Sequence, residues 1–220
     1  MTSPLIKIVD KPVWLAPCYF GSIQWYAALS MHARAVVDTG LRYDKRRKSV
    51  HRCEIVDTRA RLMLTVPVSR CKGQHCERWS QTMVSPQAQW WSDHRVSLES
   101  AYGRTPYFEH YIHRFMPWLS HEATGISIVE LDRILDEQVR RILQLDTQVS
   151  YAEADGAEAD GANDWRRTLP DFAPVPYYQV RAHKFGFQPG LSILDLIFNM
   201  GPEAPLVLHG MTQKISHNAY

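Results

Sequence analysis

The spacing of hydrophobic and polar residues near the carboxyl end predicts a buried helix. From His183 to Pro202 the chain reads HKFGFQPGLSILDLIFNMGP, and the second half of this segment is apolar on nearly every side of a helix. Ser192, Asp195 and Asn199 are the exceptions, and their i, i+3 and i+7 spacing places them on one face. Ser192 suits the N-cap of this last helix, and Gly201-Pro202 ends it. Polar groups buried there need partners, either from the backbone or from a ligand.

The first forty residues combine short apolar runs with a helical pattern. The run Trp14–Phe20 precedes a helical segment at Ser22–Met31, and Ala33–Asp38 has the composition of a buried strand. A strand, a helix and a second strand in this order make a β-α-β unit, in which the two strands are parallel.

The next segment alternates with the period of two that is typical of strands. Val50–Val56 and Leu62–Val68 both alternate, and Asp57–Ala60 between them has turn composition, so we expect an antiparallel hairpin. The sequence therefore predicts an α/β fold with a mixed sheet. It has a β-α-β opening and an antiparallel hairpin, followed by a helical segment that packs on the sheet.

Helix-start signals follow the hairpin. Ser85-Pro86 and Thr105-Pro106 each place a capping residue and a first-turn proline before a helical pattern, the first of which reaches Tyr102. Ser127 to Glu130 is a capping-box pattern that begins a third helix. Tyr177–Val180 is a candidate strand.

Length and composition predict one domain that covers residues 1–220. The chain has 220 residues and is 45% hydrophobic, which is enough for one substantial core. Residues 151–164 contain a tandem AEADG repeat without aliphatic side chains larger than alanine. Such a segment cannot offset its ordering entropy by burial, so we expect a flexible acidic loop inside the domain.

Charge argues against a nucleic-acid partner. Lys and Arg total 25 against 23 Asp and Glu, for a net charge of +2. No run approaches the ~20 apolar residues that a membrane span requires, and the start of the chain does not resemble a signal peptide. We expect a cytoplasmic protein without a membrane span, whose four cysteines are reduced.

Two residues are candidates for proton transfer. On a helix, His94 shares a face with Trp91, Leu98 and Tyr102, so its imidazole faces either the core or a cleft. Its titration range suits a general acid or base, whereas the alternative is a core histidine with satisfied nitrogens. Asp195 either satisfies backbone amides at the start of its helix or acts in catalysis.

Basic residues are candidates for phosphate binding. Lys45 lies in the basic run from Arg42 to Arg52, and Arg52 itself falls inside a predicted strand. Arginine binds phosphate through a bidentate fork and lysine as a point charge, although such runs also occur as solvated surface. The turn Pro17–Gly21, between strand and helix, brings backbone amides to an anion.

The cysteines give no clear site. Cys71, His75 and Cys76 lack the spacing of zinc ligands, so we expect no metal, and no other cofactor motif is recognisable. Cys18 is a candidate nucleophile, but nothing in its local sequence supplies an activating base.

Several landmarks, in order along the chain, resemble the WbqC-like protein family. They are Pro17-Cys-Tyr19-Phe20 with Ser22-Ile-Gln24, Tyr43-Asp-Lys45, Arg52-Cys53, Leu64–Val68, Trp90–His94, Ala101-Tyr102, Pro106–Phe108 and the block Phe187–Asn199 with Gly201. The resemblance implies a bacterial protein encoded among genes for O-antigen or other surface polysaccharides. It also implies modification of a nucleotide-linked amino sugar by acyl or aminoacyl transfer. Where relatives tend to have Arg-Asn-Arg, this chain has Val50-His51-Arg52.

Two hypotheses follow. In the first, the protein is a transferase that binds an anionic small molecule such as a sugar nucleotide, with His94 and Asp195 as catalytic residues. The ligand-binding residues are then Tyr19, Gln24, Lys45, Arg52, Tyr102 and Asn199. This hypothesis predicts one cleft where the first turn, the hairpin and the last helix converge. In the alternative, the chain is a non-catalytic binding or scaffold protein of a glycan-assembly pathway. The oligomeric state stays open.

Overall fold

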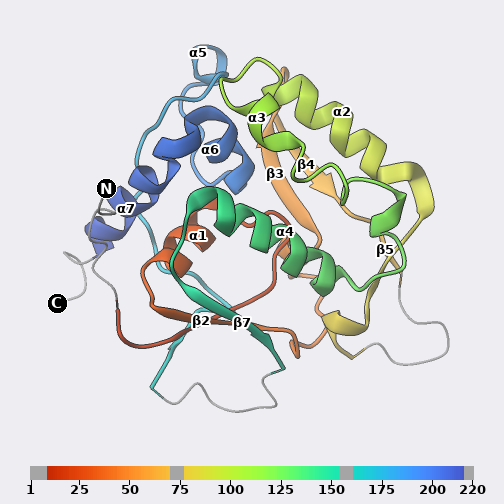
Figure 1. Ribbon diagram of the computed structural model, residues 1–220, viewed down its shortest axis with the longest axis vertical. Coiled ribbons are helices and arrows are strands. Elements are labelled where there is room, and N and C mark those ends of the chain that lie inside the picture. Colours follow the sequence, from red (N-terminus) through yellow and green to blue (C-terminus); the bar gives the residue numbers. More distant parts are fainter. Residues whose placement is uncertain (1–8, 70–76, 154–160, 216–220) are drawn as a thin grey trace.

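Four parallel strands form one end of the molecule (Figure 1). The computed structural model describes residues 9–69, 77–153 and 161–215. The strand order is β7-β2-β1-β8, with β1 at Val13–Leu15, β2 at Arg34–Asp38, β7 at Gln148–Ala152 and β8 at Asn163–Asp164. The predicted acidic loop 151–164 thus begins in one edge strand and ends in the other, and its residues 154–160 lie outside the described part of the chain.

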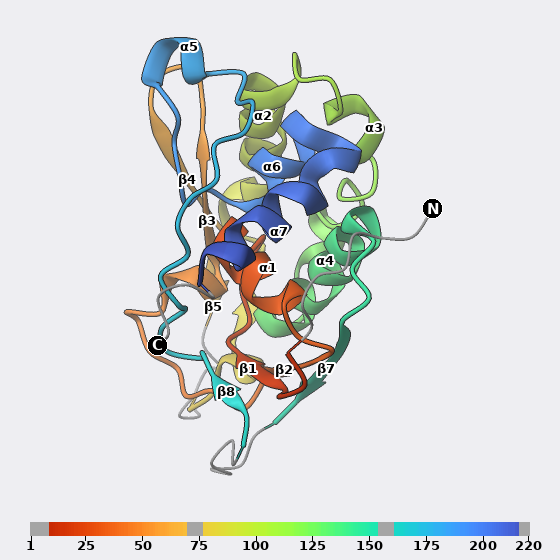
Figure 2. The same cartoon turned by 90° about the vertical axis from the view of Figure 1, so that its left-hand side faces the viewer.

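The predicted β-α-β opening is confirmed. Strands β1 and β2 pair in parallel, with Val13 opposite Ala35, and α1 (Ile23–Ser30) connects them. Nearly all of α1 is buried because helices cover it on several sides. Figure 2 shows α7 lying across it, with α4 behind.

The predicted hairpin is also confirmed. Strands β3 (Arg52–Val56) and β4 (Arg61–Thr65) pair antiparallel, with Arg52 opposite Thr65. At the turn, the Asp57 carboxylate accepts hydrogen bonds from two backbone N–H groups of the turn. A second short antiparallel pair joins β5 (Val68–Ser69) to β6 (Met83–Val84). The fold is therefore α/β, with parallel pairing in one sheet and antiparallel pairing in separate hairpins.

The helices follow the predicted order with shifted boundaries. Helix α2 spans Trp90–Tyr102, because Ala88 and Gln89 have positive φ angles of 66° and 43° that a helix cannot contain. The predicted start at Ser85-Pro86 is therefore wrong, and a short 3₁₀ turn, Gln87–Gln89, occupies that place. Helix α3 is only Phe108–Ile112.

Helix α4 (Ile128–Leu143) begins as predicted. The Ser127 hydroxyl accepts a hydrogen bond from the backbone N–H of Glu130. The Glu130 side chain does not complete a capping box but pairs with Arg133 on the next turn.

The carboxyl end differs from the prediction in two ways. Helix α6 (Ile193–Met200) is capped by Ser192, but it is not the last helix, because a 3₁₀ turn leads into α7 (Ala204–Ile215). No strand forms at residues 177–180, which the structure describes as an irregular segment before the short helix α5 (Ala182–Phe185). Instead, the Tyr177 hydroxyl donates to Asp195 and the Val180 backbone N–H donates to Asn199, both on α6.

Aromatic side chains fill the centre of the fold. Phe198 of α6 is fully buried, and its ring contacts those of Tyr102, Phe108 and Phe115 at centroid distances of 5.3, 5.0 and 6.5 Å. Helix α6 thereby joins the α2–α3 region to the rest of the core. No helix among the described residues is both long and apolar enough to cross a lipid bilayer.

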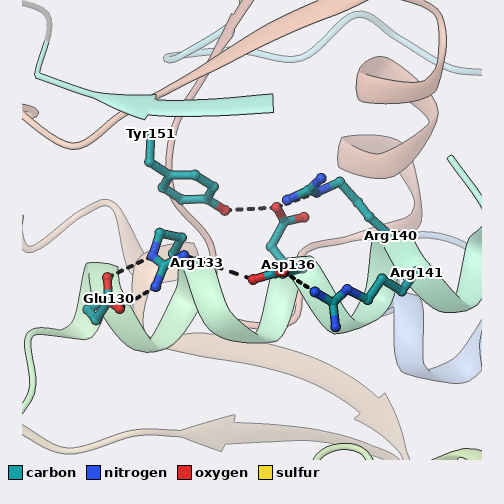
Figure 3. A network of polar contacts seen from close by, with 7 residues as sticks. Glu130, Arg133, Asp136, Arg140, Arg141 and Tyr151 are labelled. Carbon is teal, nitrogen blue, oxygen red and sulfur yellow. Dashed lines mark hydrogen bonds and ion pairs between the residues drawn. The ribbon is translucent and has the colours of Figure 1, made fainter. Parts of the chain in front are cut away.

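The buried carboxylate of Asp136 connects α4 to the sheet through Tyr151 (Figure 3) and to α1 through Tyr26. Asp136 accepts hydrogen bonds from the hydroxyls of Tyr26 and Tyr151, and it pairs with Arg140 at 2.8 Å. Burial raises the pKa of Asp136, while Arg140 and both tyrosines oppose that rise. Three elements therefore depend on one acidic side chain.

Replacing Asp136 with alanine is expected to lower the free energy of unfolding by about 3–5 kcal/mol, because it leaves Arg140 and two hydroxyls without their acceptor. The measurement is urea denaturation followed by circular dichroism. Glu137→Ala is the control on the same helix, since its ion pairs are exposed and worth about 0–1 kcal/mol. Equal losses in the two variants would contradict this account.

Candidate functional site

A cleft of about 1390 Å³ opens between the β1–α1 turn and the hairpin. Its walls come from residues 16–25, 41–54, 164–169 and 190–192, together with Met63 of β4. The turn Pro17–Gly21 and the start of β3 therefore meet here, as the sequence predicts.

Positive charge dominates the walls. Six arginines and one lysine line the cleft, against three carboxylates: Arg42, Arg46, Arg47, Lys48, Arg52, Arg166 and Arg167, against Asp44, Glu54 and Asp164. Two of the three carboxylates are already paired, since Glu54 binds Arg61 and Asp164 binds Arg166. The remaining cations outnumber the free acids, so the cleft attracts anions.

Arg47 is partly buried within this positive cluster. Burial lowers its pKa, the nearby Asp44 opposes that effect, and the like charges of Arg167 and Arg166 lower it further. Its guanidinium donates to the backbone carbonyl of Arg166. An anion placed beside Arg47 would relieve the repulsion among these three arginines.

Arg52 presents an unsatisfied donor. It is the first residue of β3 and is partly buried in the cleft wall. Its Nε atom is buried without a hydrogen-bond partner among the described residues. A buried guanidinium N–H that finds no protein acceptor is suited to receive a carboxylate or phosphate oxygen.

Two helix N-termini meet at the same wall. Ser22 caps α1 and Ser192 caps α6, and the two serines form an antiparallel backbone bridge. The bridge is made by hydrogen bonds from Ile23 N to Leu191 O and from Ile193 N to Gly21 O, at 3.0 and 2.9 Å. Both serines line the cleft, so two helix dipoles direct their positive ends towards it.

Small residues keep this wall close-packed. A Cβ atom on Gly21 would lie 2.5 Å from the Cys18 Sγ atom, so only glycine fits beside that thiol. Gly190 has a φ of +77°, which a residue with a side chain adopts only with strain.

His94 lies behind the cleft with both ring nitrogens engaged. The Thr65 carbonyl, which can only accept, lies 3.2 Å from Nε2, so Nε2 carries the proton. Nδ1 then accepts from the Tyr19 hydroxyl at 2.8 Å. Burial lowers the pKa of His94 to about 4, and His94 does not line the cleft.

Asp195 and Asn199 belong to a separate buried network. The Asp195 carboxylate accepts from the Tyr177 hydroxyl at 2.5 Å and from Gln179 Nε2 at 2.9 Å. Asn199 binds the main chain at both ends of its amide, accepting from Val180 N and donating to the Asp195 carbonyl. Burial raises the pKa of Asp195, and its hydrogen bonds oppose that rise. Neither residue lines the cleft.

The other predicted ligand-binding residues lie in different parts of the structure: some line the cleft, one lies beside Asp195, and one is exposed outside the cleft. Tyr19 and Arg52 line the cleft. Tyr102 is fully buried beside the Asp195 carboxylate. Gln24 lies next to Gly190 with its Oε1 atom buried and unpartnered among the described residues, whereas Lys45 is exposed outside the cleft. The structure thus does not bring the eight predicted residues into one shared cavity, and their roles stay predictions.

Sequence reasoning identified some residues of the cleft and missed others. Arg47 belongs to the basic run that the sequence offers for phosphate binding, whereas Ser22, which precedes the helical pattern as a cap residue does, was not assigned to the site. Arg166 and Arg167 follow the acidic repeat and carried no local signal. They reach the cleft because β8 joins the sheet beside β1.

The described residues contain no cluster of histidine, cysteine or acidic side chains that could hold a metal ion. The segment with Cys71, His75 and Cys76 lies outside those residues. Cys18 and Cys53 are buried free thiols at the floor of the cleft.

Comparison with known proteins gives one finding. A model of the WbqC-like protein family matches residues 17–170, which include the β1–α1 turn, the basic segment, the hairpin and Arg166. The C-terminal block that also carries the resemblance, Phe187–Asn199, lies beyond the matched range. No curated protein and no solved structure gives a significant match.

The buried state of His94 predicts a pH dependence of stability. The pKa of His94 is about 4 in the folded protein and roughly 6.5 in the unfolded chain, so the unfolded state binds the extra proton in this interval. The His94 contribution to stability is thus complete above pH ~6.5 and is lost as the pH falls to ~4, by roughly 3 kcal/mol in total.

His94→Gln is expected to flatten the dependence of unfolding free energy on pH between ~4 and ~6.5, because the amide does not titrate. The measurement is urea denaturation at a series of pH values, with the exposed His113→Gln as the control. If the unfolding free energy of His94→Gln depended on pH as steeply as that of the unsubstituted protein, His94 would not be the group responsible.

Proposed function

Because the chain belongs to the WbqC-like protein family, we propose that it is a transferase of bacterial surface-polysaccharide assembly. In this proposal it binds a nucleotide-linked amino sugar in the cationic cleft and modifies it by acyl or aminoacyl transfer. The observation that carries the proposal is the concentration of arginine side chains and two helix N-termini on one concave surface.

The ligand best suited to this surface is a diphosphate ester. A diphosphate offers several charged oxygens at once, which match the bidentate donors of arginine, and the positive ends of two helix dipoles favour its negative charge. Arg52 supplies its unpartnered Nε–H, and Arg47 supplies a cation crowded by like charges. The remainder of a sugar nucleotide then contacts the side chains of Trp25 and Trp165, which also line the cleft.

His94, Asp195, Tyr102 and Asn199 support the walls in this proposal. His94 fixes Tyr19, which lines the cleft, and the Asp195 network anchors α6, whose N-terminus forms one wall. Hydrogen bonds to protein groups allow these polar side chains to be buried. The same bonds leave the side chains little capacity to bind a ligand.

A specific observation favours the alternative, a binding protein without catalytic activity. The two residues predicted to transfer protons, His94 and Asp195, form hydrogen bonds with protein groups instead of facing the cleft. Under this alternative the cleft retains its anionic ligand without changing it, so ligand binding alone does not distinguish the two functions.

The binding proposal predicts that UDP and a UDP-linked amino sugar raise the melting temperature and bind measurably by calorimetry. Arg52→Gln is expected to weaken binding roughly 10- to 100-fold, because a charge-assisted hydrogen bond contributes about 1.5–3 kcal/mol. Affinity is also expected to fall as salt concentration rises.

Arg95→Gln is the matched control, since it removes the same charge from an exposed position on α2 outside the cleft. Lys45→Gln tests the contact that the sequence predicts. No melting-temperature shift with any nucleotide, or equal effects of Arg52→Gln and Arg95→Gln, would refute binding in this cleft.

A further inference from the structure

The cleft lies beyond the carboxyl ends of two neighbouring parallel strands, β1 and β8 (Figure 2). The turn that follows β1 and the segment 165–169 that follows β8 both line it. The chain passes from β1 through α1 to β2 on one side of β1, whereas β8 lies on the other side. In parallel α/β sheets, ligands bind in the crevice outside the strand ends where the connections diverge in this way. The strand topology therefore places a ligand here independently of the charge of the cleft.

Trp165 supplies an accessible aromatic surface at this strand end. It directly follows β8, and its backbone N–H donates to the carbonyl of Trp14 in β1 at 2.9 Å, so the sheet fixes its position. The Trp165 side chain is half-buried and lines the cleft. Part of its indole is thus open to a ligand.

The ring of His32 supports this indole. The two rings form a T-shaped contact with a centroid distance of 4.9 Å and an interplanar angle of 77°. His32 is itself fixed, because its Nδ1 donates to the Ala28 carbonyl and its Nε2 accepts from the side-chain amide of Asn163. A T-shaped contact covers at most one face of an indole, so His32 positions Trp165 without enclosing it.

The other aromatic residues of the cleft are less accessible than Trp165. Among the described residues, Tyr19, Phe20 and Trp25 also line the cleft, and all three are buried. Trp25 is 5% exposed, its Nε1 donates to the Ala16 carbonyl, and its ring packs against the core. These three side chains form the wall, whereas Trp165 presents a surface to the space inside it.

Phosphate-binding groups lie beside Trp165. The Arg47 guanidinium donates to the backbone carbonyl of Arg166, the residue that follows Trp165. From Arg47 the wall continues to Arg52 at the start of β3, and β3 in turn accepts a hydrogen bond from the backbone N–H of Ser192. The wall thus leads from the indole past two arginines to the N-terminus of α6.

We propose that Trp165 is the platform on which the nucleobase of the ligand stacks. This inference rests on the proposed function and gives the bound ligand a direction. The diphosphate lies along Arg47 and Arg52, and the sugar that it carries reaches the Ser192 end of the cleft. Stacking on an aromatic side chain tolerates any base, so the ligand class is a nucleoside diphosphate ester without selection of one base at this position.

The test compares UDP with inorganic pyrophosphate, which has the diphosphate but no base, by isothermal titration calorimetry. Trp165→Leu is expected to weaken UDP binding roughly 10- to 100-fold, the range that stacking of one base on an aromatic side chain provides. Pyrophosphate binding is expected to stay unchanged, which also shows that the cleft of this variant is folded. Trp165→Phe keeps an aromatic face and is expected to retain most of the affinity for UDP.

Trp91→Leu is the matched control, because Trp91 is half-buried on α2 outside the cleft. It is expected to leave the binding of both ligands unchanged. Tryptophan fluorescence gives a second readout. We expect UDP to quench the fluorescence of the unsubstituted protein, and most of this quenching to be lost in Trp165→Phe but kept in Trp91→Phe.

The two ligands distinguish this inference from the proposed function. Unchanged UDP affinity in Trp165→Leu, or equal weakening of UDP and pyrophosphate in that variant, overturns the platform and leaves the anion-binding cleft standing. Binding of neither ligand to the unsubstituted protein refutes the proposed function and this inference together.

Discussion

The backbone bridge between Ser22 and Ser192 is the contact on which the arrangement of the cleft depends. It fixes the N-terminus of α1 against that of α6, although the two serines are separated by most of the chain. The Ser192 hydroxyl strengthens the bridge by donating to the Phe20 carbonyl at 2.8 Å, and its backbone N–H binds Glu54 of the hairpin. One residue thereby connects the first turn, the hairpin and the penultimate helix, and each of them supplies a wall of the cleft.

The polar groups buried inside this protein are of two kinds. Asp136, Asp195, Asn199 and His94 each have hydrogen-bond partners in the protein, and these bonds hold helices and loops in position. Asp132 differs, since neither of its carboxylate oxygens has a hydrogen-bond partner among the described residues. A low dielectric makes an unpaired polar group unfavourable, so Asp132 lowers the stability of the fold where the other four residues contribute to it.

Local patterns were enough to predict the elements whose signals are local. The β-α-β opening, the hairpin and the Ser127 cap follow from apolar spacing and capping chemistry alone. The start of α2 could not be predicted in this way, because the residue types of Ala88 and Gln89 do not indicate their left-handed conformations. Most of the cleft also escaped prediction, since periodicity says which face of a helix is buried but not which distant segment that face contacts. The polar stripe on α6 was visible in the sequence, whereas its partners Tyr177 and Gln179 were assigned to a strand.

The strand order β7-β2-β1-β8 has a consequence for the acidic repeat. The chain leaves one edge of the sheet at Ala152 and re-enters it at the opposite edge at Asn163, so it must cross three strand spacings, about 14 Å. About five extended residues span that distance, and the chain provides ten, residues 153–162. The connection is therefore longer than its geometry demands. Its length can vary by one AEADG unit without displacing Arg166, because pairing with β1 and the ion pairs to Asp38 and Asp164 fix the downstream end.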